Sequence, residues 1–510
     1  MEDKDYNYKI YTPYEFAQRM VAKSLDEYFK NDFTVEKLEG LRITDLSCGT
    51  GNLILVALEE LIKYSKKIYG EYQYNSNWII GYDIDEDALN ICKKRSEEIF
   101  SKYNLENDSI ELICCDSLYL ELNKKYDIVL GNPPYLGEKN NKEIFQRIKS
   151  TEFGKKYYES KMDYLYFFIE KGINLLKKDG ILAYITTNYW LKADSAAKLR
   201  KELKDKGKFF KIELYDFSLF KNAVGQHNII FYWKKDGIED GIEIFEERIS
   251  FVGKNSEIYN ENGKIILAPE EIMRLNSNIN NKKNYYLGDI LNINQGIVTG
   301  LDKAFIFEEF NEKFKKYLKP FYKSKDIGKY INSKIPPFWI LYLNGDTQID
   351  EEVKEYLEKY REELSKRREV KTGKINWWEL QWARDSEIFQ KPKIVVRQRC
   401  KSNNFSYTEE IFYGSADIYY MTEKKEDINL FYILGYLNSK IFYIWFKYNG
   451  KIKGKNLEFY STPLKETPIY YPENKEERIY IEKLVKKQIE GYDEEIQKEI
   501  DEYFYNVFTD

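Results

Sequence analysis

The 510-residue chain contains a single histidine and five cysteines. One histidine, His227, excludes serine-histidine triads, histidine-rich metal sites and paired histidine acid-base catalysis. Its strand-like surroundings, Gln226 to Trp233, favour a structural role. The cysteines show neither ligand spacing nor an even framework, so we expect reduced core residues with no disulfide and no metal site. They are Cys48, Cys92, Cys114, Cys115 and Cys400.

Long apolar runs are also missing. The most apolar late stretch, Ile428 to Phe446, is interrupted by Asn438 and Lys440, so no membrane span is expected. The first residues, Met1 to Asp5, lack the basic-then-apolar order of a signal peptide. We therefore expect a soluble, intracellular protein without a membrane partner.

Basic residues are unevenly distributed along the chain. The formal net charge is −5, yet residues 281–470 hold 33 Lys and Arg against 26 Asp and Glu. This local excess favours contact with a polyanion in the second half. The length and a hydrophobic content of 43% suffice for two cores. We therefore predict two globular parts.

Four apolar, strand-like runs each end in a polar or acidic residue. Those residues are Asp45, Asp83, Asp116 and Asn132. Because the carboxyl ends of parallel strands meet at one edge of an open sheet, we expect these side chains to border one ligand site. An acid such as Asp83 is well placed to accept hydrogen bonds from ribose hydroxyls, although an acid at this position can equally cap the following helix.

A short glycine-containing loop follows the first of these strands. It reads Ser47-Cys48-Gly49-Thr50-Gly51 and precedes a helix-like segment. Glycine at such a turn lets backbone N–H groups and a helix N-terminus approach a ligand. The loop lacks the third glycine of a dinucleotide fingerprint and the Gly-Lys-Ser/Thr of a phosphate loop.

The tetrapeptide Asn132-Pro133-Pro134-Tyr135 follows the fourth strand. The Asn132 side-chain oxygen and the Pro133 carbonyl can each accept a hydrogen bond from an amino group, which pulls the nitrogen lone pair out of conjugation with a ring. Proline fixes φ and removes a competing donor, and the Tyr135 ring can lie flat against a base. The alternative is an ordinary strand followed by a proline-rich turn.

Together these motifs resemble the gamma group of DNA adenine-N6 methyltransferases of the TaqI-like type. The chain also looks close to solitary sporulation-associated adenine methyltransferases. Tyr11-Thr12-Pro13 is similar to motif ten of the family, Asp45 to Gly51 to motif one, Asp83-Ile84 to motif two, Asp116-Ser117-Leu118 to motif three, and Asn132 to Tyr135 to motif four. In motif one a second acid and an extra glycine are missing, which leaves open which loop groups touch the methionine end of the cofactor.

The resemblance implies S-adenosylmethionine as methyl donor and a flipped adenine in double-stranded DNA as acceptor. Asn132, Pro133 and Tyr135 would be catalytic, and Tyr135 and Phe220 would stack on the base. For Phe220, a plain core position is the alternative. Direct in-line transfer without a general base is expected. The cofactor-binding residues carried over are Tyr11, Thr12, Pro13, Asp45, Ser47, Cys48, Gly49, Gly51, Asp83, Ile84, Asp116, Ser117 and Asn132.

The second half continues the resemblance. Asn294 to Phe305 looks like the opening of the family's recognition domain, and Trp377 to Arg384 and Leu434 to Lys440 look like later parts of it. We expect base or phosphate contacts there, with solvated surface as the alternative for each residue. The candidates are Gln295, Lys303, Arg384, Arg397, Arg399, Lys451 and Lys453.

The predicted fold class is α/β, with a doubly wound, seven-stranded methyltransferase domain followed by a mixed α+β target-recognition domain. We predict a catalytic domain over 1–240, a connecting segment over 241–285, the recognition domain over 286–470 and C-terminal helices over 471–510. The enzyme would be cytoplasmic in a bacterium or archaeon, nucleoid-associated through DNA, and either partnered by a separate restriction endonuclease or solitary. The alternatives are a catalytically silent DNA-binding module, or a methyltransferase that acts on RNA or on a protein amide.

Overall fold

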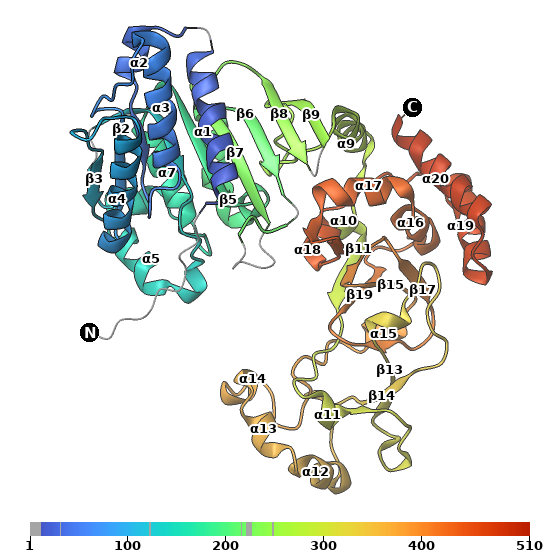
Figure 1. Ribbon diagram of the computed structural model, residues 1–510. Coiled ribbons are helices and arrows are strands. Elements are labelled where there is room, and N and C mark those ends of the chain that lie inside the picture. The colour runs from blue at the N-terminus through green and yellow to red at the C-terminus, as the bar shows by residue number, and fades with distance from the viewer. Residues whose placement is uncertain are drawn as a thin grey trace. The chain divides into compact units, whose positions relative to one another are not determined.

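A computed structural model of the protein describes residues 12–30, 32–121, 124–215, 217–220, 227–246 and 249–509. The chain divides into two compact units, Met1–Glu270 and Glu271–Asp510 (Figure 1). Among the described residues, no helix combines the length and the apolar character needed to cross a bilayer.

A nine-stranded sheet forms the centre of the first unit, in the order β3-β2-β1-β4-β5-β7-β6-β8-β9. Its strands are β1 (Ile43–Asp45), β2 (Ile79–Asp83), β3 (Glu111–Cys114), β4 (Tyr126–Gly131), β5 (Leu176–Thr187), β6 (Gly207–Leu214), β7 (Asn228–Lys235), β8 (Gly241–Glu246) and β9 (Ile249–Lys254). The adjacent strands β3, β2, β1, β4 and β5 run parallel to one another. Strand β7 runs antiparallel to both of its neighbours, β5 and β6. The predicted doubly wound sheet is confirmed. Strands β8 and β9, in a stretch expected to be a connecting segment, extend it.

Helices cover both faces of this sheet (Figure 1). One face carries α1 (Tyr14–Phe29), α2 (Val35–Gly40), α3 (Ile54–Tyr69) and α4 (Glu86–Lys102), and the other carries α5 (Lys142–Lys149), α6 (Glu152–Tyr157), α7 (Leu165–Leu175) and α8 (Ala197–Lys206). Along β4, Ile128 and Leu130 pack into the core on the face covered by α1 to α4. Val129 packs into the core on the face covered by α5 to α8. A strand buried on both faces explains the continuous apolar run in its sequence.

Strand β1 lies between β2 and β4, and the strand order reverses at the β1–β4 pair. Strands β1 to β3 form one half of the sheet, and the strands from β4 onward form the other half. Ligands of open α/β sheets bind in the crevice at such a switch point, outside the carboxyl ends of the strands. The fold therefore places Asp45 and Asn132 beside the expected ligand site.

The second unit is a mixed α+β body. One four-stranded sheet joins β11 (Leu291–Gln295), β19 (Ile418–Glu423), β15 (Lys393–Arg397) and β17 (Phe405–Thr408); the other joins β12 (Ile306–Phe307), β14 (Phe338–Leu341), β13 (Leu318–Tyr322) and β18 (Tyr413–Gly414). A three-stranded sheet contains β16 (Arg399–Cys400), β21 (Asn456–Glu458) and β20 (Lys451–Lys453), and β10 (Tyr285–Tyr286) pairs with β22 (Pro468–Ile469).

Helices lie at both ends of this second unit, with α9, α10 and α16 to α20 at one end and α11 to α14 at the other (Figure 1). Gly435 on α16 permits close packing against α19, because a Cβ there would lie 2.8 Å from Ile481. The helices are α9 (Glu270–Lys282), α10 (Leu287–Ile290), α11 (Asp302–Phe305), α12 (Glu351–Glu358), α13 (Arg361–Ser365), α14 (Arg368–Lys371), α15 (Glu387–Gln390), α16 (Leu430–Leu437), α17 (Lys440–Asn449), α18 (Ser461–Lys465), α19 (Lys475–Glu490) and α20 (Glu494–Thr509). Helices α19 and α20 are thus part of the core of this unit.

The cysteines of the described residues are free, and three of them are buried. Cys114, at the end of the outermost strand β3, is exposed, so the expectation of a core position is wrong for this residue. Strand β3 has a neighbour on one side only, and its burial pattern is correspondingly weak.

One carboxyl group is buried in the first unit without a hydrogen-bond partner. Glu170 on α7 is 2% exposed, and neither of its side-chain oxygens has a partner among the described residues. Burial, followed by the charge of Glu202, raises the pKa of Glu170 to about 9. Glu170 is therefore protonated at pH 7.

Glu170→Gln is expected to flatten the dependence of unfolding free energy on pH. Folding raises the pKa of Glu170 above its ordinary value of 4.5. The stabilisation from its proton is therefore complete below that value and is lost as the pH rises toward 9. Between pH 5 and 8 wild type should lose stability relative to the variant, at most about 1.4 kcal/mol per pH unit. Urea unfolding at pH 5 and pH 8 measures the free energy of unfolding of both proteins. An equal loss of stability in wild type and variant would show that Glu170 is charged in the folded protein.

Candidate active site

The glycine loop after β1 is fastened to the end of β2. The Gly49 amide donates to Asp83 Oδ2 at 2.7 Å, and Asp83 Oδ1 accepts from the Asp85 amide at 2.9 Å. Gly49 and Gly51 have φ values of 52° and 87°. A Cβ at Gly51 would also lie 2.4 Å from Cys92 Sγ. The loop thus needs glycine here, and it closes tightly over the sheet edge.

Asp45, at the end of β1, is a buried acid. It is 2% exposed, and its Oδ1 accepts from the Ser47 amide at 2.9 Å. Burial raises the pKa of Asp45 to about 7; the Ser47 amide opposes this shift and the nearby Asp83 adds to it. A cationic group bound beside Asp45 would stabilise the ionised form.

The residues after β2 and β3 complete this edge of the sheet. Ile84 is 70% exposed, which is unusual for an isoleucine and leaves its side chain open to an apolar ligand surface. Ser117 is buried and donates to the Leu46 carbonyl at 2.7 Å, which joins the ends of β3 and β1. Asp116 is half-buried, and burial raises its pKa, whereas Arg147 and Lys171 act in the opposite direction.

A chain of hydrogen bonds leads from the glycine loop to Asn132. Arg95 on α4 donates to the Asn52 side-chain oxygen at 2.7 Å and to the Thr50 carbonyl at 2.6 Å. Asn52 Nδ2 donates to the Thr12 carbonyl at 2.8 Å. Thr12 Oγ1 in turn accepts from Asn132 Nδ2 at 3.3 Å. The amide nitrogen of Asn132 therefore faces Thr12, which fixes the position of the amide oxygen.

That amide oxygen lies beside a tyrosine hydroxyl. Tyr135 OH donates to Asn132 Oδ1 at 2.8 Å and lies 3.1 Å from the Ile185 carbonyl. A phenol has one hydrogen, so only one of these bonds is made at a time. An amide oxygen has two lone pairs and can accept two hydrogen bonds. Burial, followed by the charge of Asp163, raises the pKa of Tyr135 and keeps its hydroxyl protonated.

The other acceptor of the tetrapeptide is the Pro133 carbonyl. Pro133 is buried and Pro134 is exposed. Proline has no amide hydrogen, and no described residue donates to the Pro133 carbonyl. The turn after β4 therefore offers two oxygen acceptors next to an aromatic ring.

Asp163 holds the segment that follows the tetrapeptide. Its Oδ1 accepts from the Leu136 amide at 3.0 Å and from the Leu165 amide at 3.1 Å. Burial raises the pKa of Asp163, although these amide donors oppose the shift. Sequence reasoning did not identify Asp163 as a site residue. An acid at a helix start does not reveal a second contact with a distant turn.

The remaining predicted site residues differ in their surroundings. Tyr11 falls outside the described residues. Thr12 and Cys48 are buried, and Pro13 and Ser47 are half-buried near the loop. Phe220 is 4% exposed within the core, and no described ring contact joins it to Tyr135. Its role in stacking stays a prediction.

The predicted DNA-contacting residues of the second unit have different partners. Arg384 donates to Gln295 Oε1 at 3.2 Å. Arg397 donates to the Ile327 carbonyl at 2.8 Å, and Lys303 pairs with Glu363 at 2.7 Å. Arg384, Arg397 and Lys303 each have an intramolecular partner, and contact of any of them with DNA stays a prediction.

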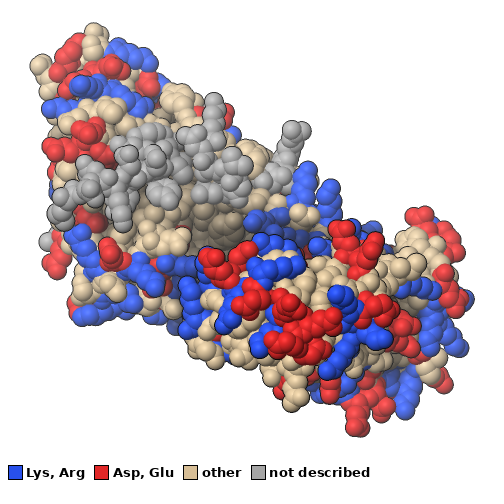
Figure 2. Space-filling view, turned by 90° about the horizontal axis from the view of Figure 1, so that it is seen from below, with Lys and Arg blue, Asp and Glu red and all other residues tan. Residues whose placement is uncertain are grey.

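Arg399 and Lys451 lie together on the three-stranded sheet. Each pairs with the buried Glu458, at 2.8 Å and 3.3 Å. Lys453 is exposed at the end of the same hairpin. On the face shown in Figure 2, Lys and Arg side chains of the second unit lie interspersed with Asp and Glu side chains.

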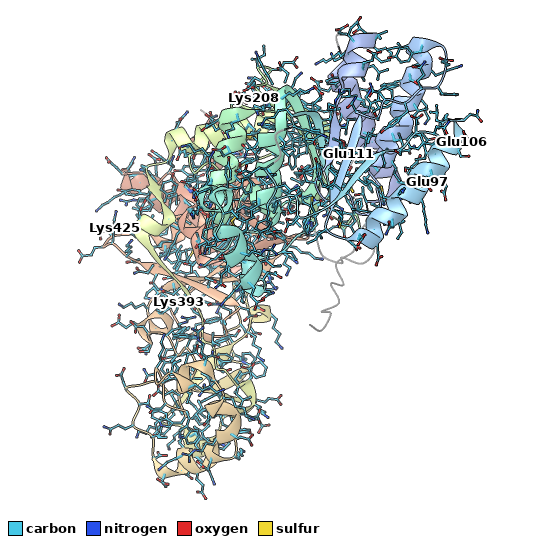
Figure 3. The ribbon with its side chains drawn as sticks, turned by 90° about the vertical axis from the view of Figure 1, so that its left-hand side faces the viewer. Glu97, Glu106, Glu111, Lys208, Lys393 and Lys425 are labelled. Atoms are coloured by element: carbon cyan, nitrogen blue, oxygen red, sulfur yellow. The ribbon has the colours of Figure 1, made fainter. Side chains whose placement is uncertain are left out.

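One lysine of the basic second half is internal. Lys393 (Figure 3) is fully buried, and its Nζ donates to the Glu410 carbonyl at 2.8 Å. Burial lowers its pKa to about 8. The count of basic residues in this region therefore overstates the charge available to a polyanion.

The first unit has the fold of an S-adenosylmethionine-dependent methyltransferase. Seven of its strands follow the order β3-β2-β1-β4-β5-β7-β6, and the acids and the tetrapeptide lie at the carboxyl edge.

Comparison with known families specifies the class further. Residues 77–221 match the Eco57I restriction-modification methylase family, and residues 319–469 match the TaqI-like C-terminal specificity domain. The predicted resemblance to TaqI-like enzymes is thereby confirmed. The first match lies within the first unit and the second within the second unit.

Similar proteins cover most of the chain. The Type II methyltransferase M.HindII of Haemophilus influenzae is 28% identical over 74% of this chain and 82% of its own length. The Type II methyltransferase M.BanIII of Aneurinibacillus aneurinilyticus is 24% identical over 98% and 95%. The structure of the Type IIL restriction-modification enzyme MmeI in complex with DNA has a TM-score of 0.67 at 14% identity, covering 97% of this chain and 73% of that one.

Binding of S-adenosylmethionine is expected to strengthen as the pH rises through 7. Protonation neutralises Asp45, so affinity should fall by about tenfold per pH unit well below its pKa. Asp45→Asn should bind weakly and without this dependence. Isothermal titration calorimetry between pH 5.5 and 8.5 measures both. Equal pH profiles for the two proteins would show that Asp45 does not face the cationic part of the ligand.

Thr12→Val should lower the single-turnover rate of methyl transfer by about tenfold or more, because the Asn132 amide loses the acceptor that orients it. Thr12→Ser keeps the hydroxyl and should restore most of the rate. If Thr12 served the cofactor alone, Thr12→Val would raise the KM for S-adenosylmethionine and leave the saturated rate unchanged.

Proposed function

We propose that this protein is a site-specific DNA methyltransferase that transfers a methyl group from S-adenosylmethionine to N6 of an adenine extruded from double-stranded DNA. The proposal rests on one observation above all. The Asn132 to Tyr135 turn lies at the carboxyl end of β4, and the Asn132 amide is oriented by Thr12.

The residues at the sheet edge suit this cofactor. Asp83 uses its oxygens for two backbone amides and keeps lone pairs for ribose hydroxyls. Ile84 offers an exposed apolar surface to an adenine ring, and Asp116 can accept from its amino group. The buried Asp45 complements a positive charge. When bound, S-adenosylmethionine supplies a sulfonium methyl group as the electrophile.

The turn would grip the acceptor amine through its two oxygens. Asn132 Oδ1 and the Pro133 carbonyl accept the amine hydrogens, and the nitrogen lone pair leaves conjugation with the ring. No side chain needs to act as a general base, because the nitrogen becomes acidic once it is alkylated and its proton can pass to water. Alignment and these two acceptors therefore supply most of the rate.

Extrusion of the base costs a few kcal/mol, and stacking has to offset part of that cost. The Tyr135 ring packs between the two cores of the unit and is only half-buried. Stacking of a base on such a ring contributes roughly 1–3 kcal/mol. Phe220 can serve as the second face only if the base displaces the side chains that now cover it.

Duplex DNA as substrate is supported by the specificity domain and by relatives that are Type II methyltransferases. A separate restriction endonuclease would make this enzyme the protecting half of a restriction-modification pair. Without one, the enzyme would mark host DNA by itself. Both roles require the same chemistry at Asn132.

Asn132→Ala is expected to lower methyl transfer to unmethylated duplex DNA by a factor of about 100 to 1,000, since one of the two acceptors is lost. Binding of S-adenosylmethionine should stay within a few fold of wild type. Transfer of tritiated methyl groups, followed by digestion and separation of nucleosides, measures both the rate and the product. Asn140→Ala, at an exposed position eight residues further on, is the matched control.

Several outcomes would contradict the proposal. Label in methylcytosine would exclude adenine as the acceptor. Label that survives DNase treatment would point to RNA or protein. Wild type that binds the cofactor and labels nothing would be a catalytically silent DNA-binding protein.

A further inference from the structure

Two segments from distant parts of the sequence meet in the second unit. Val298 and Trp382 exchange backbone hydrogen bonds of 3.1 Å and 2.9 Å. Next to this pair, Arg384 donates from Nε to the Gly296 carbonyl at 3.1 Å and from Nη2 to Gln295 Oε1 at 3.2 Å. The opening of the specificity domain and the segment from Trp377 to Arg384, here called the arginine arm, therefore form one local structure.

The arginine arm is held rigidly by a second arginine. Arg367 is 9% exposed and donates only to backbone carbonyls. Two of them belong to the arm, Trp377 at 2.7 Å and Glu379 at 2.8 Å, and a third is Thr299 at 3.2 Å. The arm consequently needs little ordering when a ligand binds, which is typical of a preorganised site.

Arg384 has an uncommon backbone and a supported side chain. Its φ is +66°, a conformation that residues other than glycine seldom adopt. Tyr342 OH donates to its carbonyl at 2.8 Å. Burial lowers the pKa of Arg384. Nε and one hydrogen of Nη2 are used internally, and no described residue accepts from Nη1. The outer edge of the guanidinium is thus oriented and left for a ligand.

Arg384 is one of the residues that line a cavity of about 250 Å³. Trp382 lines the cavity and is 42% exposed, although an indole of this size is normally buried. The other lining residues are Asn344, Gly345, Ile375, Glu379, Leu380, Gln381 and Ala383. None of the lining residues is a lysine, and Glu379 carries an acid. The charge of Glu379 offsets that of Arg384, so the lining suits the neutral edge of a base better than a phosphate.

We infer that Arg384 and Trp382 form a guanine-binding site that reads one base of the DNA recognition sequence. Arg384 donates from Nη1 and from the second hydrogen of Nη2 to O6 and N7 of the guanine, the bidentate contact that distinguishes G·C in the major groove. Trp382 packs against the neighbouring nucleotide. The inference rests on the proposed function and assigns the part of it that selects sequence.

Arg384→Lys keeps a charge and loses the two-pronged geometry. The Kd for a duplex with the cognate site should rise about 10- to 100-fold, and the Kd for unrelated duplex should change less than twofold. Mapping of methylated sites in a randomised duplex library should show relaxed selection at one guanine position. Arg478→Lys, at another half-buried arginine of the same unit that bonds to Tyr471, is the matched control and should change neither readout.

Arg384→Gln gives a second, positive test. Glutamine makes the corresponding bidentate contact with adenine, so preference at the same position should shift from G toward A. A library readout of this kind depends on the molecules that still fold and methylate, so partial unfolding of either variant does not mimic a shift in preference.

Two results would overturn the guanine site while the proposed function stands. One is an unchanged site preference in both variants, or a wild-type recognition sequence without guanine. The other is an equal loss of affinity for all sequences with a salt dependence reduced by about one phosphate contact. Failure of wild type to methylate any duplex DNA would instead contradict the proposed function itself.

Discussion

The orientation of the Asn132 amide is the constraint on which the rest of the site depends. An amide can present either its oxygen or its nitrogen, and only the oxygen can accept a hydrogen bond from an amine. Thr12 settles this choice by accepting from the amide nitrogen. The position of Thr12 depends in turn on Asn52, directly after the glycine loop, and on Arg95 of α4. The groups suited to the donor and the groups suited to the acceptor are therefore joined by one chain of hydrogen bonds.

The sheet positions both ends of that chain. Asn132 is fixed by β4, which is buried on both faces. Thr12 comes just before α1, and α1 is anchored to β6 by a contact of 3.2 Å between Arg19 and the buried Glu213. Tyr215 donates to the same carboxylate at 2.6 Å and lies 2.7 Å from Arg19. A charge this deeply buried must be paired to be tolerated, so the network both fixes the helix and satisfies Glu213.

Most of the catalytic fold could be predicted from the sequence because its strands are short apolar runs closed by Asp45, Asp83, Asp116 and Asn132. Periodicity and turn residues are local signals, and they suffice for elements of this kind. The roles of Arg95, Asn52 and Asp163 were not predictable, since each depends on a side-chain contact between segments that only the fold brings together.

Basic residues of the second unit were the weakest predictions. Sequence alone does not distinguish a lysine that is buried, such as Lys393, from one that is exposed, such as Lys453.

Sequencing of DNA from a host that expresses the full chain, with detection of modified bases, tests the central claim most directly. We expect N6-methyladenine at one recurring sequence, in proportion to expression of the wild-type protein. Two results would contradict the role of Asn132 as hydrogen-bond acceptor for the adenine amino group. One is DNA that carries modified cytosine instead. The other is unmodified DNA although the purified protein binds S-adenosylmethionine.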